Sequence, residues 1–148
     1  MKHIFKSALL TFALALCGAC SDDSKVEPWL EVNVNNVAGT WQLAEWNGAP
    51  LPAGSYVYLK LIRRDCLFEM TQNLDSFLKR ELTGRFRITN DEEQGAIIRG
   101  LYDHGTGDWK HAYLITELTA DRMVWTAQDD PDDISVYLRI EEIPADLE

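Results

Sequence analysis

Leu82-Thr83-Gly84-Arg85-Phe86-Arg87-Ile88-Thr89 is the stretch that decides the fold class. Its polar and apolar residues alternate strictly, so in a β-strand the two sets would face opposite sides. In a helix, Arg85 and Arg87 would be scattered around the axis and no apolar stripe would form. The period of two therefore predicts a strand with one face toward a core.

The same alternation occurs on both sides of this stretch. In residues 109–115, Trp109, His111, Tyr113 and Ile115 would share one face. In residues 134–140, the set Ile134, Val136, Leu138 and Ile140 alternates with Ser135, Tyr137 and Arg139. The aliphatic set is expected to face the core, which would point Arg139 outward.

Strand patterns of this kind recur along the chain and are separated by turn residues such as Asn47-Gly48, Asn90-Asp91, Gly105 and the acidic run Asp129–Asp133. The predicted strands are Thr40–Asn47, Ser55–Ile62, Cys66–Gln72, Leu82–Thr89, Gly95–Tyr102, Trp109–Glu117, Arg122–Ala127 and Ile134–Glu142. Eight sequential strands predict an all-β fold, an antiparallel up-and-down β-barrel, because closure removes unpaired edges. A two-sheet β-sandwich is the alternative.

Composition excludes several classes of protein. The chain has 148 residues, 46% of them hydrophobic, and a formal net charge of −10. This length predicts one domain, and the acidic balance argues against a nucleic-acid binder. No apolar run approaches the roughly 20 residues of a membrane-spanning helix.

The beginning of the chain carries an export signal. Lys2 and Lys6 precede an apolar stretch, Ser7–Leu16, and small residues lead to Gly18-Ala19-Cys20. This ending resembles a lipobox, which implies that residues 1–19 are a lipoprotein signal peptide and that Cys20 is acylated. Cys17 is the weaker choice for acylation because Leu16 precedes it.

The residues that follow Cys20 suggest where the protein is sent. Ser21-Asp22-Asp23-Ser24 is similar to the acidic export tag of surface lipoproteins of Bacteroidota, although a solvated linker is the alternative. We expect residues 20–36 to be the lipidated cysteine and tether, and residues 37–148 to form the domain. The expected location is the outer membrane, lipid-anchored and exposed at the cell surface, with a periplasm-facing domain as the alternative.

Gly39-Thr40-Trp41 opens the first predicted strand and resembles the G-x-W signature of lipocalins. The resemblance, over about residues 37–143, implies an eight-stranded barrel. It also implies that Trp41 closes one end beneath an arginine of the last strand, for which Arg139 is the candidate.

Catalytic and metal sites are not expected. There is no G-x-S-x-G motif, and Cys66 shares its predicted face with Phe68 and Met70, which favours an undissociated thiol over a nucleophile paired with His111. The runs 103–108 and 129–133 are rich in carboxylates but are better explained as solvated turns than as calcium sites. The sequence therefore predicts a protein that is not an enzyme, with no cofactor and no metal.

The predicted barrel interior is the candidate ligand site. Its candidate lining residues are Trp41, Phe68, Phe86, Tyr102, Trp109, His111, Tyr113 and Trp125. An aromatic pocket with a few polar tips suits a small hydrophobic ligand. These side chains could equally fill the barrel, in which case the protein would be an accessory module whose protein partner is unknown. On the outer face, Arg85, Arg87, Arg99 and Lys110 are expected to form a basic wall for an anionic partner.

Overall fold

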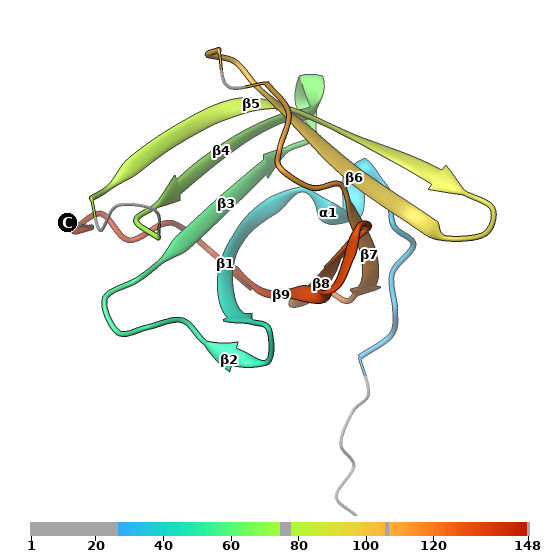
Figure 1. Cartoon of the computed structure of the whole chain (residues 1–148), viewed down its shortest axis with the longest axis horizontal. Helices are drawn as coiled ribbons and strands as arrows, with labels where there is room; N and C mark the ends of the chain where they lie inside the picture. Colours follow the sequence, from blue (N-terminus) through green and yellow to red (C-terminus); the bar gives the residue numbers. More distant parts are fainter. Residues whose placement is uncertain (1–26, 75–77, 106, 148) are drawn as a thin grey trace, which may run out of the picture.

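The computed structural model describes residues 27–74, 78–105 and 107–147. These residues form one antiparallel sheet and very little helix (Figure 1). The elements are α1 (Val34–Val37), β1 (Gly39–Trp46), β2 (Ala49–Pro50), β3 (Val57–Ile62), the single 3-10 turn η1 (Arg64–Cys66), β4 (Leu67–Gln72), β5 (Arg80–Asp91), β6 (Gly95–Tyr102), β7 (Tyr113–Leu118), β8 (Arg122–Ala127) and β9 (Asp130–Ile140).

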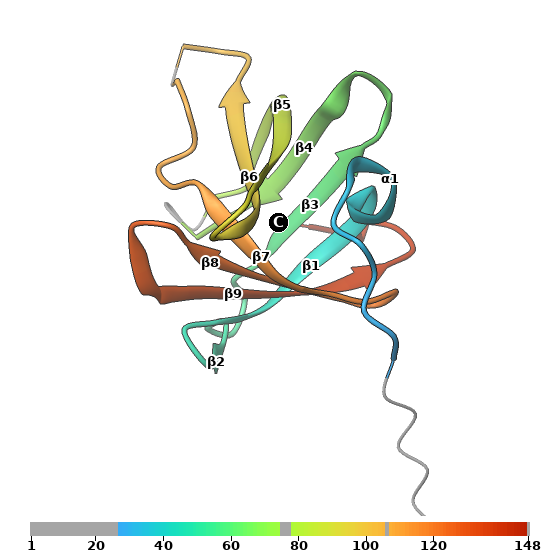
Figure 2. The same ribbon diagram turned by 90° about the vertical axis from the view of Figure 1, so that its right-hand side faces the viewer.

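The sheet closes on itself. Each strand from β3 to β9 pairs with its neighbour in sequence, and β9 pairs with β1. Strand β2 is a short extension that pairs only with the end of β1. The predicted eight-stranded up-and-down barrel is thus confirmed, and the sandwich is excluded because the β1–β9 pairing leaves no separate second sheet. Figure 2 shows the strands wrapped around a common interior.

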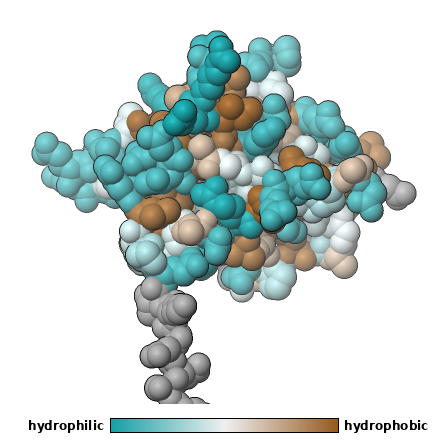
Figure 3. Space-filling model, turned by 180° about the vertical axis from the view of Figure 1, so that it is seen from behind, coloured by the Kyte–Doolittle hydropathy of each residue, from teal (hydrophilic) through white to brown (hydrophobic). Residues whose placement is uncertain are grey.

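Alternation decides which side chains fill this interior. On β5, Gly84 and Phe86 are buried while Arg85 and Arg87 are exposed, as the Leu82–Thr89 pattern predicts. Seen from behind, the outer surface is mainly hydrophilic, with small hydrophobic areas between charged groups (Figure 3). Among the described residues, the largest fully buried side chains are Val37, Trp41, Leu59, Leu61, Phe68, Ile98, Leu118 and Met123.

One end of the barrel is plugged by Trp41. Its indole Nε1 donates to the Val37 carbonyl of α1 at 2.9 Å, and the Arg139 guanidinium lies 4.1 Å from the centre of its ring. The same guanidinium donates to the carbonyl oxygens of Ala38, at 2.8 Å, and Asn36, at 3.0 Å. The arrangement implied by the G-x-W resemblance is therefore present at what we call the closed end.

The position of Arg139 corrects the predicted orientation of the last strand. Leu43 and Trp41, both buried, pair with Tyr137 and Arg139, and directly paired residues share a face. Tyr137 is consequently buried, whereas Leu138 is 44% exposed. The prediction is wrong for Leu138 and Ile134, which are exposed, whereas Val136 is buried as expected. The pairing of β9 with β1, whose register shifts between Leu43 and Glu45, decides which residues face the interior.

A second correction concerns the strand predicted from Trp109. Strand β7 begins only at Tyr113, and it pairs with β6 through just Ile97–Leu114 and Ile98–Tyr113. The Trp109 amide instead donates to the Gly100 carbonyl at 2.9 Å, two residues out of that register. Lys110–Ala112 bulge out between the two pairings, so Lys110 does not extend the outer face of β7.

The last hairpin is also tighter than expected. The turn that precedes β9 consists of Gln128 and Asp129, and the strand already begins at Asp130 instead of after the acidic run. The register between β8 and β9 shifts here, because Thr126 pairs with Ile134 while the next residue, Ala127, pairs with Asp130. The residues between Asp130 and Ile134 therefore have no paired residue on β8.

The residues before the barrel pack against its closed end. The Leu30 amide donates to the Leu118 carbonyl at 2.8 Å, and Leu30, Val32 and Val34 contact the buried core. The predicted signal peptide and Cys20 lie outside the described residues. Within the part that is described, no helix is long and apolar enough to cross a membrane.

Candidate functional site

The end of the barrel opposite Trp41 holds a half-open cavity of about 290 Å³, which we call the cup. It lies where β4 ends and β5 begins, next to the end of β6 and the start of β7. The residues that line it are Val57, Met70, Gln72, Leu74, Arg80, Leu82, Tyr102, Trp109, Lys110, Tyr113, Trp125 and Tyr137. The interior is thus filled at the closed end and hollow at the open end.

Aromatic rings build the wall of the cup. The ring of Trp125 lies 5.6 Å from that of Trp109, 5.3 Å from that of Tyr113 and 4.8 Å from that of Tyr137, measured between centroids. Phe68 supports this layer from below, with its ring 5.1 Å from Trp109 in an edge-on arrangement. Such contacts hold each ring in a fixed orientation, so the wall is preorganised.

Gly100 makes room for the Trp109 ring. A methyl group at this position would collide with the indole of Trp109, which lies flat against the backbone of β6. At Gly84, on the neighbouring strand, a methyl group would collide with the Leu101 carbonyl of β6 and with the ring of Phe68. The two glycines of the inward face therefore admit large rings where ordinary side chains would fill the space.

Two polar atoms in the wall are left without partners. Trp109 and Trp125 are only 8% and 2% exposed, and neither indole Nε1 has a hydrogen-bond partner among the described residues. A buried donor without an acceptor costs free energy. Both rings line the cup, but their N–H groups have almost no accessible surface and the Trp109 Nε1 lies against the backbone at Gly100, so these donors are covered by the protein itself.

The predicted site residues separate into three groups. Tyr102, Trp109, Tyr113 and Trp125 line the cup. Trp41, Phe68 and Phe86 are buried below it in the core. His111 is the exception, because its ring is not part of the cup wall.

His111 instead joins two loops at the rim. Its Nδ1 lies 2.6 Å from a carboxylate oxygen of Asp129, and its Nε2 lies 3.9 Å from Asp133. The hydrogen bond from His111 holds the pKa of the Asp129 carboxyl below its usual value. This contact fixes the turn between β8 and β9 beside the bulge at Lys110–Ala112.

Burial raises the pKa of two tyrosines of the cup, Tyr113 and Tyr137. Loss of solvation, with a smaller effect of Asp133, raises the pKa of Tyr113 to about 12. Burial likewise raises the pKa of Tyr137 well above its usual range.

Sequence reasoning missed several residues of the cup. Tyr137 was assigned to the outside, and Lys110 was placed in the basic wall, although it lines the mouth. Gln72 and Arg80 lie at strand ends, where alternation gives little information. The pairing of Leu43 with Tyr137 shows that Tyr137 faces the interior, but this pairing can be seen only in the folded barrel.

The Cys66–His111 pair, considered as a catalyst, is not brought together. Cys66 precedes β4 at the closed end, while His111 contacts the β8–β9 turn at the open end. Among the described residues, no group of three or more His, Cys, Asp or Glu side chains could hold a metal ion. The arrangement of the cup is thus suited to binding by shape, aromatic contact and hydrogen bonding.

Comparisons with known proteins support the fold. No protein-family model and no curated protein matches the chain. A lipocalin-like protein from Bacteroides uniformis, known from a crystal structure, superposes with a TM-score of 0.52 at 14% identity, over 71% of this chain and 99% of that one. An NMR structure of a protein from the same organism gives a TM-score of 0.56 at 16% identity, over 76% of this chain and 96% of the other. The chain has a lipocalin-like fold.

Proposed function

We propose that this protein is a lipid-anchored binding protein whose cup takes a small, mostly apolar ligand that carries hydrogen-bond acceptors. The observation that carries the proposal is the cup itself: a half-open cavity of about 290 Å³ at one end of a barrel whose other end is filled. This volume lies at the lower end of the range of small-molecule sites, which favours a compact ligand over a long lipid chain.

The chemistry of the wall supports a ligand of mixed character. The rings of Trp109, Trp125 and Tyr137 offer flat apolar surface, and Arg80, Lys110 and Tyr113 in the lining carry hydrogen-bond donors. A carbonyl, carboxylate or ether oxygen on a ring-shaped ligand would match both features.

The anchor is proposed from the sequence. Acylation of Cys20 would attach the chain to the outer membrane, and the first described residues lead to the closed end of the barrel. The mouth of the cup would then lie at the end remote from the attachment point. A ligand could therefore reach the cup from the aqueous side.

Native mass spectrometry of the protein isolated gently from its own host tests ligand binding. We expect a bound small molecule in addition to the polypeptide mass. Recovery of the bare polypeptide alone after gentle isolation would contradict the proposal.

A matched pair of variants locates the site. Leu82→Trp places a large ring inside the cup, whereas Leu138→Trp places the same ring on the outer face of β9, away from both hollows. We expect the bound molecule to be lost from Leu82→Trp and retained by Leu138→Trp. Equal retention by both folded variants would show that the cup is not the site.

The anchor has its own test. Cys20→Ala should abolish incorporation of radiolabelled palmitate and release the protein from membranes, while Cys17→Ala should change neither. Continued labelling of the Cys20→Ala variant would assign the lipid to Cys17 and contradict the proposed attachment.

A further inference from the structure

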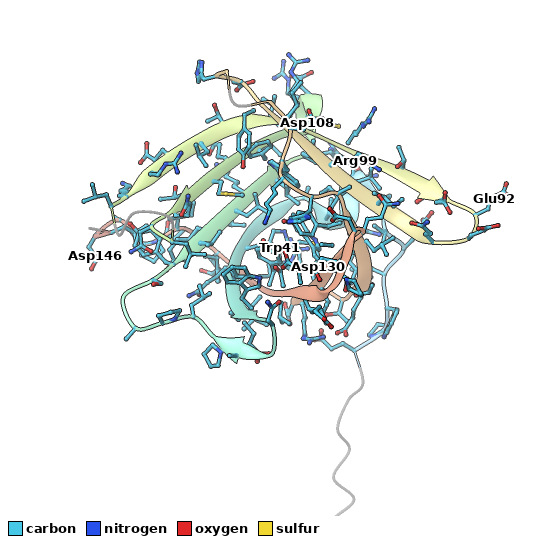
Figure 4. All side chains as sticks on the ribbon, in the orientation of Figure 1. Trp41, Glu92, Arg99, Asp108, Asp130 and Asp146 are labelled. Carbon is cyan, nitrogen blue, oxygen red and sulfur yellow. The ribbon has the colours of Figure 1, made fainter. Side chains whose placement is uncertain are left out.

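A second hollow, separate from the cup, lies on the outer face of β5 and β6. Its volume is about 340 Å³, and Arg85, Arg87, Arg99, Leu101 and Asp108 contribute to its lining. Figure 4 shows Arg99 and Asp108 on the upper side of the barrel, away from Trp41 in the interior. We call this hollow the arginine groove.

The strand register concentrates positive charge in the groove. Arg87 and Arg99 are directly paired across β5 and β6, and Arg85 pairs with the next outward residue, Leu101. Like charges placed opposite each other destabilise a sheet. Arg87 and Arg99 therefore repel each other across the two strands, and an anion bound between them would offset this repulsion.

The protein supplies little counter-charge of its own. Neither Arg85 nor Arg87 forms an ion pair with a carboxylate of the described residues, and Arg99 donates to the neutral amide oxygen of Gln128 at 2.9 Å. That contact, together with the bond from Gln128 to Gln94, steadies the Arg99 side chain without neutralising it. Asp108 is the one carboxylate in the lining, and it forms no ion pair with these arginines.

We propose that the arginine groove binds an oxyanion-bearing sugar, one that carries sulfate, phosphate or carboxylate groups. Guanidinium groups match planar and tetrahedral oxyanions through paired hydrogen bonds. Leu101, 52% exposed beside them, offers an apolar patch for a sugar ring. A hollow of this size accommodates a small ligand, while a protein partner would need a surface of about 800 Å².

Other polyanions fit less well. Single-stranded nucleic acids use aromatic side chains as stacking platforms, and no exposed aromatic residue lines the groove. The described segment before α1 begins on the side of the barrel away from β5 and β6 (Figures 1 and 2), so a membrane surface on that side would not face the groove.

The test is an NMR titration of the isotopically labelled full chain with a trisulfated heparin disaccharide, with its unsulfated counterpart as the neutral control. We expect amide shifts confined to β5 and β6, an affinity that falls as salt is added, and no shifts with the unsulfated disaccharide. No shift with the sulfated sugar, or equal shifts with both sugars, would overturn the proposal.

Two variants with the same change in charge sharpen the test. Arg87→Gln removes a groove arginine, and Arg64→Gln removes one whose side chain is 92% exposed, on η1. We expect Arg87→Gln to weaken binding about tenfold and Arg64→Gln to weaken it less than about twofold. Equal weakening by both would mean that only net charge matters. Tighter binding of an oligonucleotide or of phosphatidylglycerol vesicles than of the sugar would likewise overturn the proposal.

Discussion

The two ends of this barrel are built from the same residue types but treat them differently. At the closed end, the Trp41 indole N–H has an acceptor, and its ring is covered by Arg139. At the open end, Trp109 and Trp125 are also buried, but their indole N–H groups have no acceptor among the described residues, and their rings border a cavity. Tryptophan content alone therefore does not identify a binding site. What distinguishes the open end is the space left beside its rings.

The largest expected effect tests the closed end as the source of stability. Trp41→Ala should lower the free energy of unfolding by about 3 to 5 kcal/mol, because a fully buried ring and its contacts are lost. Chemical denaturation measures this change. The control is Trp46→Ala, which removes a half-exposed indole and should cost less than about 1 kcal/mol. Equal losses of unfolding free energy in the two variants would show that the buried Trp41 ring contributes no more to stability than the half-exposed Trp46 ring.

A second variant tests Arg139, whose guanidinium lies over the Trp41 ring. Arg139→Gln should cost roughly 1 to 3 kcal/mol, since backbone carbonyls of Asn36, Ala38 and Ala120 lose their donor. Arg87→Gln is the control with the same chemical change on the outer face, and it should shift stability by no more than about 0.5 kcal/mol. If thermal melting showed similar stability for both variants, Arg139 would not hold the closed end.

The smallest effect is expected at the open end and only at high pH. Because the pKa of Tyr113 is raised from 10.0 to about 12, the unfolded chain ionises first, and stability is lost as pH rises above 10. Tyr113→Phe should reduce this alkaline loss of unfolding free energy by roughly 1 kcal/mol near pH 12. Near neutral pH it should leave the pH dependence of the unfolding free energy unchanged. Denaturation at pH 7 and at alkaline pH measures the difference. An unchanged alkaline profile would show that Tyr113 is accessible to water.

Sequence reasoning succeeded where only one of the two alternating sets was apolar. Residues 82–89 could bury Phe86 and Ile88 in one orientation only, because the other orientation would bury arginines. In residues 134–140 both sets carry large apolar groups, so the pattern could not decide between Leu138 and Tyr137. The pairing with β1 across the barrel closure made the choice, and no local pattern contains that information.

Alternation predicted only part of the candidate site, because it carries no information on contacts between segments. Tyr102, Trp109, Tyr113 and Trp125 were assigned to the interior by alternation, and they line the cup. His111 shares their alternation in sequence, but the bulge between Trp109 and Tyr113 turns it toward Asp129. A bulge depends on contacts between distant segments, here the fit of the Trp109 ring over Gly100.

The short ladder between β6 and β7 determines what the mouth of the cup is made of. Among the described strands, β5 and β6 share eight paired positions, whereas β6 and β7 share two. Residues 107–109 add hydrogen bonds to β6, from the Tyr102 amide to the Gly107 carbonyl and from the Trp109 amide to the Gly100 carbonyl. Lys110–Ala112 leave the sheet between these bonds and the ladder, so an irregular segment, and not a regular strand, borders the mouth on this flank.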